Sequence, residues 1–149
     1  MVASNNGCFA KVVEYLGRAA HAGGAPDKGV NALSAAAIAL AAVNAQRETF
    51  RDQDTVRVHP IITKGGDLVN VIPADVRLET FVRGRTLEAI RDANRKVDRC
   101  LRAGALAMGA KVRITTLPGY LPCHCDPYLG SLFKQNAVKA VPLTPSLEG

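Results

Sequence analysis

The feature that most constrains the fold of this 149-residue chain is a loop rich in glycine and proline that runs directly into an alanine-rich helix. Gly23, Gly24 and Pro26 interrupt the preceding strand, because glycine permits positive φ and proline lacks a backbone donor. Eight alanines between residues 32 and 45 favour a long helix with a slim surface that another element can approach closely. The loop therefore presents one histidine, His21, beside a rigid element.

The composition is that of a globular domain. The chain is long enough to bury a core, and no run of about 18 apolar residues predicts a membrane span. The net charge of +6 is spread along the sequence and predicts a solvated basic surface. Irregular spacing argues against a disulfide framework and favours a reduced, cytoplasmic setting for the four cysteines, Cys8, Cys100, Cys123 and Cys125.

Hydrophobic periodicity predicts the order strand, helix, strand, strand, helix, strand. Joined by right-handed crossovers, these elements form an α+β fold of the ferredoxin-like βαββαβ type. We therefore expect a four-stranded antiparallel sheet with two helices on one face. The expected elements are strands at residues 8–16, 55–63, 69–83 and 111–116, a first helix that begins after the cap at Asp27 or Gly29 and fades near Phe50, and a second helix at residues 86–109.

Local signals mark where several of these elements begin and end. Asp27 or Gly29 is the expected N-cap of the first helix. Thr86 is expected to cap the second helix, and Gly109 to end it. The segment Lys64–Asp67, which contains two glycines, predicts a hairpin turn.

The middle strands carry two further signals. Pro60 cannot donate to a ladder, so the strand at residues 55–63 is expected at a sheet edge or with a bulge. The next strand alternates after Pro73, so that one set of side chains faces the core, namely Val76, Leu78, Thr80 and Val82.

The character of the chain changes after Pro118-Gly119. Asp126, followed by a proline, predicts the start of a short helix. Its apolar stripe of Leu129, Leu132 and Phe133 has no place in a completed βαββαβ unit.

Four places carry candidate chemistry. Histidine suits proton transfer or hydrogen bonding near neutral pH, although a loop histidine such as His21 is also a common surface residue. Asn70 follows a Gly-Gly turn and can simply bond its own backbone. Arg83, at a strand end, is able to clamp a carboxylate or to remain solvated. The metal alternative, Cys123-His124-Cys125, has tighter spacing than zinc sites use, so we expect these residues to be incidental.

Three stretches, GRAAHAGGAPDKGVNAL, KGGDLVNVIPADVRLETFVRGRT and PGYLP, closely resemble the lid, or dimerisation, domain of dinuclear-zinc amidohydrolases and exopeptidases. That family includes aminoacylase, carboxypeptidase G and N-acyl-amino-acid amidohydrolases. The resemblance extends from about Ser4 to Ala137. It implies a loose segment at residues 1–6, a lid domain at residues 7–119, and a tail at residues 120–149 that returns to a catalytic domain absent from this sequence.

The resemblance also implies roles for three residues. His21 would reach into the partner subunit's active site and stabilise the tetrahedral intermediate, Asn70 would hydrogen-bond the substrate, and Arg83 would take its carboxylate. The two zinc ions of the parent enzyme, and its general base, match nothing here, so the chain alone is expected to be inactive and to bind no metal. A homodimer through the first helix and the edge strand at residues 56–63 is expected, acting on N-acyl amino acids.

Two other classes remain open from the residues themselves. A regulatory module that binds small molecules between subunits has the same element order. An RNA-binding sheet needs aromatic residues on adjacent central strands, and Phe81 is the only one in the third strand. We therefore expect neither a nucleic acid nor a membrane as partner.

Overall fold

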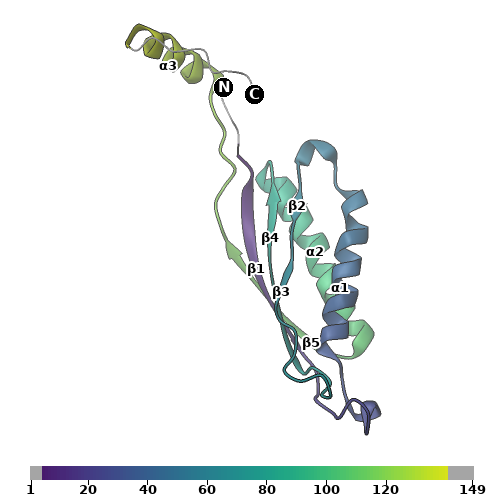
Figure 1. Cartoon of the computed structure of the whole chain (residues 1–149). Coiled ribbons are helices and arrows are strands. Elements are labelled where there is room, and N and C mark those ends of the chain that lie inside the picture. The colour runs from purple at the N-terminus through teal and green to yellow at the C-terminus, as the bar shows by residue number, and fades with distance from the viewer. Residues whose placement is uncertain (1–4, 141–149) are drawn as a thin grey trace. The chain divides into compact units, whose positions relative to one another are not determined.

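A computed structural model describes residues 5–140, which divide into two compact units. Residues 1–4 of the expected loose segment and residues 141–149 of the expected tail lie outside this range. The larger unit, residues 6–122, contains β1 (Gly7–Leu16), η1 (Pro26–Lys28), α1 (Ala32–Gln46), η2 (Arg47–Thr49), η3 (Asp52–Asp54), β2 (Arg57–Val58), β3 (Ile61–Lys64), β4 (Asp75–Gly84), α2 (Leu87–Met108) and β5 (Lys111–Pro118), where η marks a short 3-10 helix (Figure 1).

The strands form one antiparallel sheet in the order β2-β4-β1-β5, and β3 also pairs with β4. Both α1 and α2 cover the same face of this sheet (Figure 1). The predicted ferredoxin-like α+β fold is therefore confirmed. The sheet has five strands where four were expected, because the second predicted strand is divided into β2 and β3.

The division occurs at Pro60, which was predicted to lie at an edge or a bulge. β2 ends at Val58 and β3 begins at Ile61, and both lie along the same side of β4. Proline has no N–H for the ladder, so it separates the two short strands at the sheet edge. The predicted hairpin turn at residues 64–67 is wrong, because the chain returns to the sheet only after a longer loop, residues 65–74.

β4 shows the predicted alternation. Its even-numbered positions from Val76 to Val82 are buried, and the odd-numbered positions between them are exposed. The buried set packs under the helices with Val13 and Tyr15 of β1. One face of β4 therefore anchors the core, and the other carries Arg83 on the face that the helices leave open.

The predicted ends of α2 are confirmed, and the predicted start of α1 is not. Thr86 caps α2 by accepting a hydrogen bond from the Ala89 amide at 3.1 Å, and Gly109 ends it with φ of 66°, both as predicted. The cap of α1 is Asn31, whose Oδ1 accepts from two backbone amides at 2.9 and 3.0 Å. The prediction of Asp27 or Gly29 is wrong, because the segment before Asn31 is pinned by other backbone pairs.

Small residues let α1 and α2 approach closely. A Cβ added to Gly104 of α2 would overlap the carbonyl oxygen of Ala35 and lie 2.8 Å from the Cβ of Ala39. Both alanines are buried. The alanine residues of α1 therefore allow close contact between the two helices.

Replacing Gly104 with alanine should lower the free energy of unfolding by up to about 2 kcal/mol. The helices must separate to admit the methyl group, at a cost of about 1–3 kcal/mol, and alanine regains roughly 1 kcal/mol over glycine within a helix. The added Cβ would overlap a backbone oxygen, which cannot move aside as a side chain could, so the cost lies at the upper end of its range. The midpoint of urea denaturation measures it, with the exposed Arg102→Ala in the same helix as control. An unchanged midpoint for Gly104→Ala would contradict the close approach.

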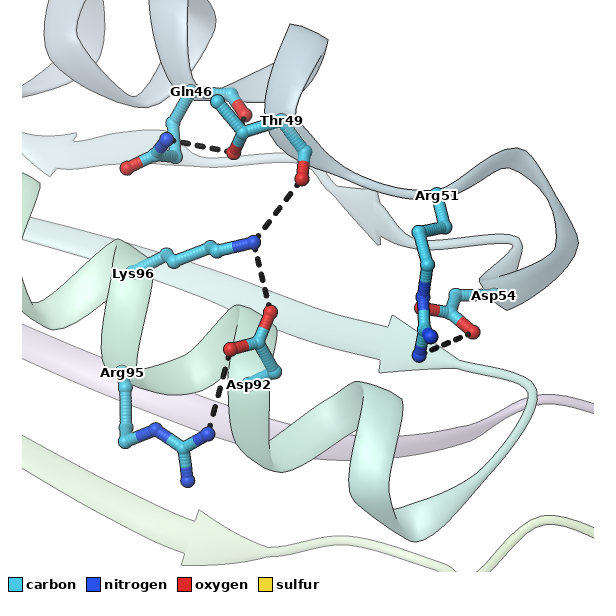
Figure 2. Close-up of polar contacts among 7 residues, drawn as sticks. All are labelled: Gln46, Thr49, Arg51, Asp54, Asp92, Arg95 and Lys96. Carbon is cyan, nitrogen blue, oxygen red and sulfur yellow. Dashed lines mark hydrogen bonds and ion pairs between the residues drawn. The ribbon is translucent and has the colours of Figure 1, made fainter.

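Polar contacts tie the segment after α1 to α2 (Figure 2). The Lys96 ammonium donates to the carbonyl oxygen of Thr49 at 3.1 Å and forms an ion pair of 2.8 Å with Asp92. Arg51 and Asp54 form a separate ion pair of 2.9 Å in the same segment. These contacts fix the connection that leads from α1 to the β2–β3 edge.

The described part of the smaller unit consists of Asn5 and residues 123–140, with α3 (Pro127–Ala140). Asp126 caps α3 as predicted, because its Oδ1 accepts from the amides of Tyr128 at 2.7 Å and Leu129 at 3.2 Å. All three residues of the predicted apolar stripe are exposed, with Leu129, Leu132 and Phe133 at 61%, 41% and 75%. Among the helices of residues 5–140, none combines the length and apolar character needed to cross a membrane.

Candidate functional site

The loop that carries His21 lies between two other segments and forms backbone hydrogen bonds with both. The amides of Arg18 and Val30 donate to each other's carbonyl oxygens at 3.0 and 2.9 Å. This places residues 28–30 along one side of residues 18–22. The loop is therefore held by hydrogen bonds on its outer side, although its sequence is rich in glycine.

Residues 70–72 lie along the other side. The Ala22 amide donates to the carbonyl oxygen of Asn70 at 2.9 Å, and the Ile72 amide donates to the carbonyl oxygen of Ala20, also at 2.9 Å. His21 itself lies opposite the residue that follows Asn70. The fold thus brings together His21 and Asn70, which are 49 positions apart, and both side chains remain exposed.

The imidazole of His21 is fixed by the turn that follows it. Its Nδ1 accepts hydrogen bonds from the amides of Gly23 at 3.2 Å and Gly24 at 2.9 Å. The expectation that these glycines provide positive φ is wrong, because positive φ occurs only at Thr55, Gly66 and Gly109 within the described residues. β1 already ends at Leu16, so the glycines act as amide donors to the ring and not as breakers of the strand.

The loop that bears Asn70 has a charged stem. Lys64, at the end of β3, forms an ion pair of 2.9 Å with Asp75, at the start of β4. The hydrogen bond between them lowers the pKa of the Asp75 carboxyl and raises the pKa of Lys64. Beside this stem lies an open hollow of about 440 Å3, lined by Leu33, residues 65–69, Val71 and Pro73.

Arg83 lies elsewhere. It is exposed on the open face of β4, and its guanidinium stacks over the Phe81 ring at 5.2 Å. Directly opposite on β2 is Arg57, also exposed. Within residues 5–140, neither arginine forms an ion pair with a carboxylate.

The three candidate residues therefore do not form one site in a single chain. His21 and Asn70 lie beyond the start of β4 at Asp75, and Arg83 lies eight residues farther along that strand. At about 3.4 Å per residue the separation along β4 is roughly 27 Å. In Figure 1 the loops lie near one end of the sheet, and the arrowhead of β4 points to the other.

The metal alternative at Cys123-His124-Cys125 lies in the smaller unit. Burial raises the pKa of the Cys125 thiol, and its hydrogen bond with Cys123 raises it further. In the part of the chain that the structure describes, no three His, Cys, Asp or Glu residues are grouped so that they could hold a metal ion. These residues therefore do not fit the zinc ions that the family resemblance implies.

The sequence did not reveal the backbone pairing around His21 or the two amides on its ring. The only available signal was the Gly-Gly pair two and three residues after the histidine, and such a pair predicts a strand break as readily as a pair of amide donors. Buried Lys11 in β1, at 1% exposure, was also missed, because a lysine among alternating apolar residues usually marks the solvent side.

These features define a class: an α+β domain of ferredoxin-like topology with a fixed histidine loop beyond one end of β4 and an exposed arginine near its other end. The peptidase dimerisation domain family matches residues 4–108. The chain belongs to this family. The alternatives of a regulatory module and an RNA-binding sheet find no support in the comparisons, and self-association is the property that the family name implies.

The relatives are longer proteins. The chain is 38% identical over 102 residues to a mouse Xaa-Arg dipeptidase and 36% identical to the human one, with 68% of this chain and 23% of each relative aligned. An aminobenzoyl-glutamate utilization protein of Klebsiella pneumoniae has a similar structure, with a TM-score of 0.76 and 22% identity over 93% of this chain and 35% of that one. An aminopeptidase of Bacillus cereus has a TM-score of 0.71 and 23% identity over 97% and 38%. The chain thus spans about a quarter of the length of its curated relatives.

Proposed function

We propose that this chain is the dimerisation and lid domain of a zinc-dependent hydrolase that cleaves the amide bond of N-acylated amino acids. Family membership supports the domain assignment. The names of two similar proteins, a dipeptidase and an aminobenzoyl-glutamate utilization protein, both describe an amino acid joined through an amide. Such substrates share an amide carbonyl and a free carboxylate, the two groups for which His21 and Arg83 are suited.

The observation that carries the proposal is the separation of these groups along the sheet, with an uncovered strand edge between them. The edge formed by β2 and β3 runs from Arg57, opposite Arg83, to Lys64, at the stem of the Asn70 loop. A two-fold axis at this edge pairs it with the same edge of a second copy in the antiparallel sense. The partner's sheet is then turned end for end relative to the first.

This end-for-end arrangement determines which residues of the two subunits meet. The partner's histidine loop would lie at the end of the joined sheet where this subunit carries Arg83. We therefore infer a composite site that combines Arg83 of one subunit with His21 and Asn70 of the other. The slim exposed side of α1, with Ala37, Ile38 and Ala41, supports the same interface.

In this composite site each residue has a separate task. The His21 ring donates a hydrogen bond to the substrate carbonyl oxygen and stabilises the negative charge that develops there. The Asn70 amide hydrogen-bonds the substrate beside it. Arg83 holds the substrate carboxylate, with two parallel hydrogen bonds available from its guanidinium.

The remaining parts of the enzyme would come from outside this chain. Since residues 5–140 do not fit zinc, we propose that the two ions and the general base belong to a catalytic domain of the full-length protein. The lid domain would comprise residues 7–119, after a loose segment at residues 1–6. Residues 120–149 would lead back to the catalytic domain, which would cover the apolar stripe of α3. Irregularly spaced cysteines support a cytoplasmic location.

A mixed dimer of the full-length enzyme tests this arrangement. We expect His21→Ala and Arg83→Ala enzymes to be impaired separately and to regain activity when their subunits are exchanged. One of the two sites in the mixed dimer then has its own Arg83 and the partner's intact His21. Activity should return to as much as half of the wild-type value per mixed dimer, because the other site lacks both groups.

Two controls make the result decisive. Mass spectrometry of tagged subunits shows that mixed dimers form, and a mixture of two His21→Ala preparations must stay impaired. If mixed dimers form without any recovery, Arg83 and His21 act on the same site from the same subunit, and the composite site is refuted.

A further inference from the structure

The ring of His21 has one nitrogen that is already engaged. Nδ1 lies 3.2 Å from the Gly23 amide nitrogen and 2.9 Å from that of Gly24, and in both contacts the backbone N–H is the donor. A ring nitrogen that accepts hydrogen bonds must present its lone pair and cannot carry a proton. A neutral His21 held in this way therefore carries its single N–H on Nε2.

The donors and the ring belong to one closed turn. The Ala25 amide donates to the carbonyl oxygen of His21 at 3.0 Å, so the turn that contains both glycines folds back on the histidine. The Ala22 amide is engaged by Asn70 at the same time. Rotation of the ring away from the two amides would leave them without these partners, so the turn sets the orientation of the imidazole as well as its tautomer.

The glycines are not required for space at the ring. A Cβ at Gly23 would lie 3.6 Å from Cε1 of His21, and one at Gly24 would lie 3.4 Å from Nδ1, which are ordinary van der Waals distances. Neither position has positive φ. Alanine therefore fits at both positions and keeps the amide, whereas proline removes it.

We propose that the amides of Gly23 and Gly24 fix His21 as the Nε2–H tautomer and so make it a hydrogen-bond donor toward the substrate carbonyl. The inference deepens the proposed function and rests on it for the identity of the acceptor. A carbonyl oxygen gains negative charge when the amide is attacked, and of the two neutral tautomers only the one that donates from Nε2 stabilises that charge. The opposite tautomer would present the Nε2 lone pair to the same oxygen and repel it. Gly23 and Gly24 are thus positioning residues that act through His21.

The test is nitrogen NMR on the 15N-labelled 149-residue chain at alkaline pH, where imidazoles are neutral. We expect His21 Nδ1 to give the signal of an unprotonated nitrogen, Nε2 that of a protonated one, and a coupling across the hydrogen bond from the Gly24 amide. His59 and His124, whose rings accept no backbone hydrogen bond in the described residues, are internal references. A His21 spectrum identical to theirs, or one with the proton mainly on Nδ1, overturns the proposal.

Paired variants separate the amide from the side chain. Gly24→Pro should shift the ratio of the two His21 tautomers by about two- to tenfold, the usual net effect of one hydrogen bond. Gly24→Ala, which keeps the amide, should leave the ratio unchanged. An equal shift in both variants would overturn the proposal, and if Gly24→Pro does not fold, the wild-type spectrum still decides.

The full-length enzyme provides a second measurement. Gly24→Pro should lower kcat with little change in KM, and Gly24→Ala should change neither. Because the tautomer is measured on this chain alone, its result is independent of the mixed-dimer experiment. A locked tautomer without recovery in mixed dimers would refute the composite site and leave the role of the amides intact.

Discussion

Replacing His21 with alanine in the full-length enzyme should lower kcat about 100- to 1,000-fold, the usual cost of losing one preorganised donor to a developing oxyanion. The ring is fixed before substrate binds, because its Nδ1 accepts from two amides and its loop is paired on both sides. Little energy is therefore spent on orienting it during the reaction. Steady-state kinetics on an N-acyl amino acid measures the loss.

Two further measurements assign the loss to this donor. Zinc content should stay at the wild-type level, since His21 is proposed to contact the substrate and not the metal. His124→Ala, which removes another exposed histidine of the chain, should leave kcat unchanged. A kcat for His21→Ala equal to that of wild type, or a loss of activity that follows loss of zinc, would contradict the proposed role.

Replacing Asp98 with alanine should destabilise the domain by about 3–5 kcal/mol, because it leaves a buried charge without its partner. The Lys11 side chain is fully buried, with Nζ 2.6 Å from Asp98 Oδ1 and 2.8 Å from Thr116 Oγ1. The pair links β1 to α2, and the hydroxyl of Thr116 belongs to β5. Urea denaturation followed by circular dichroism measures the change in the free energy of unfolding.

Two matched variants isolate the buried charge as the cause. Lys11→Met removes the charge together with its need for a partner, so it should cost much less than Asp98→Ala. Asp92→Ala removes an aspartate that pairs with Lys96 on the surface of the same helix and should cost at most about 1 kcal/mol. Equal losses for Asp98→Ala and Asp92→Ala would show that Lys11 is not isolated from water.

Several elements followed from the sequence because their signals are local. The alternation of β4 reflects a period of two residues, and the cap of α2 needs only Thr86 and the amide three residues later. Asp126 identified the start of α3 for the same reason. The family resemblance supplied three candidate residues, His21, Asn70 and Arg83, and their roles stay predictions.

Tertiary structure decided which of these residues meet. His21 and Asn70 are 49 positions apart, and only the backbone pairing of their loops brings them together. Arg83 is much nearer to Asn70 in sequence, yet an extended strand carries it to the far end of the sheet.

Contacts with other segments of the chain also explain why the cap of α1 and the burial of Lys11 were not predicted. Asn31 is the cap of α1 in place of Asp27 because Val30 pairs with Arg18 and the Ala32 amide donates to the carbonyl oxygen of the distant Pro73. Lys11 is buried because Asp98 faces it from another element. By itself, the sequence determined the elements whose hydrogen bonds and apolar periods span a few residues. Contacts between residues far apart in the chain leave no local pattern, so only the folded structure fixed the site and the charge in the core.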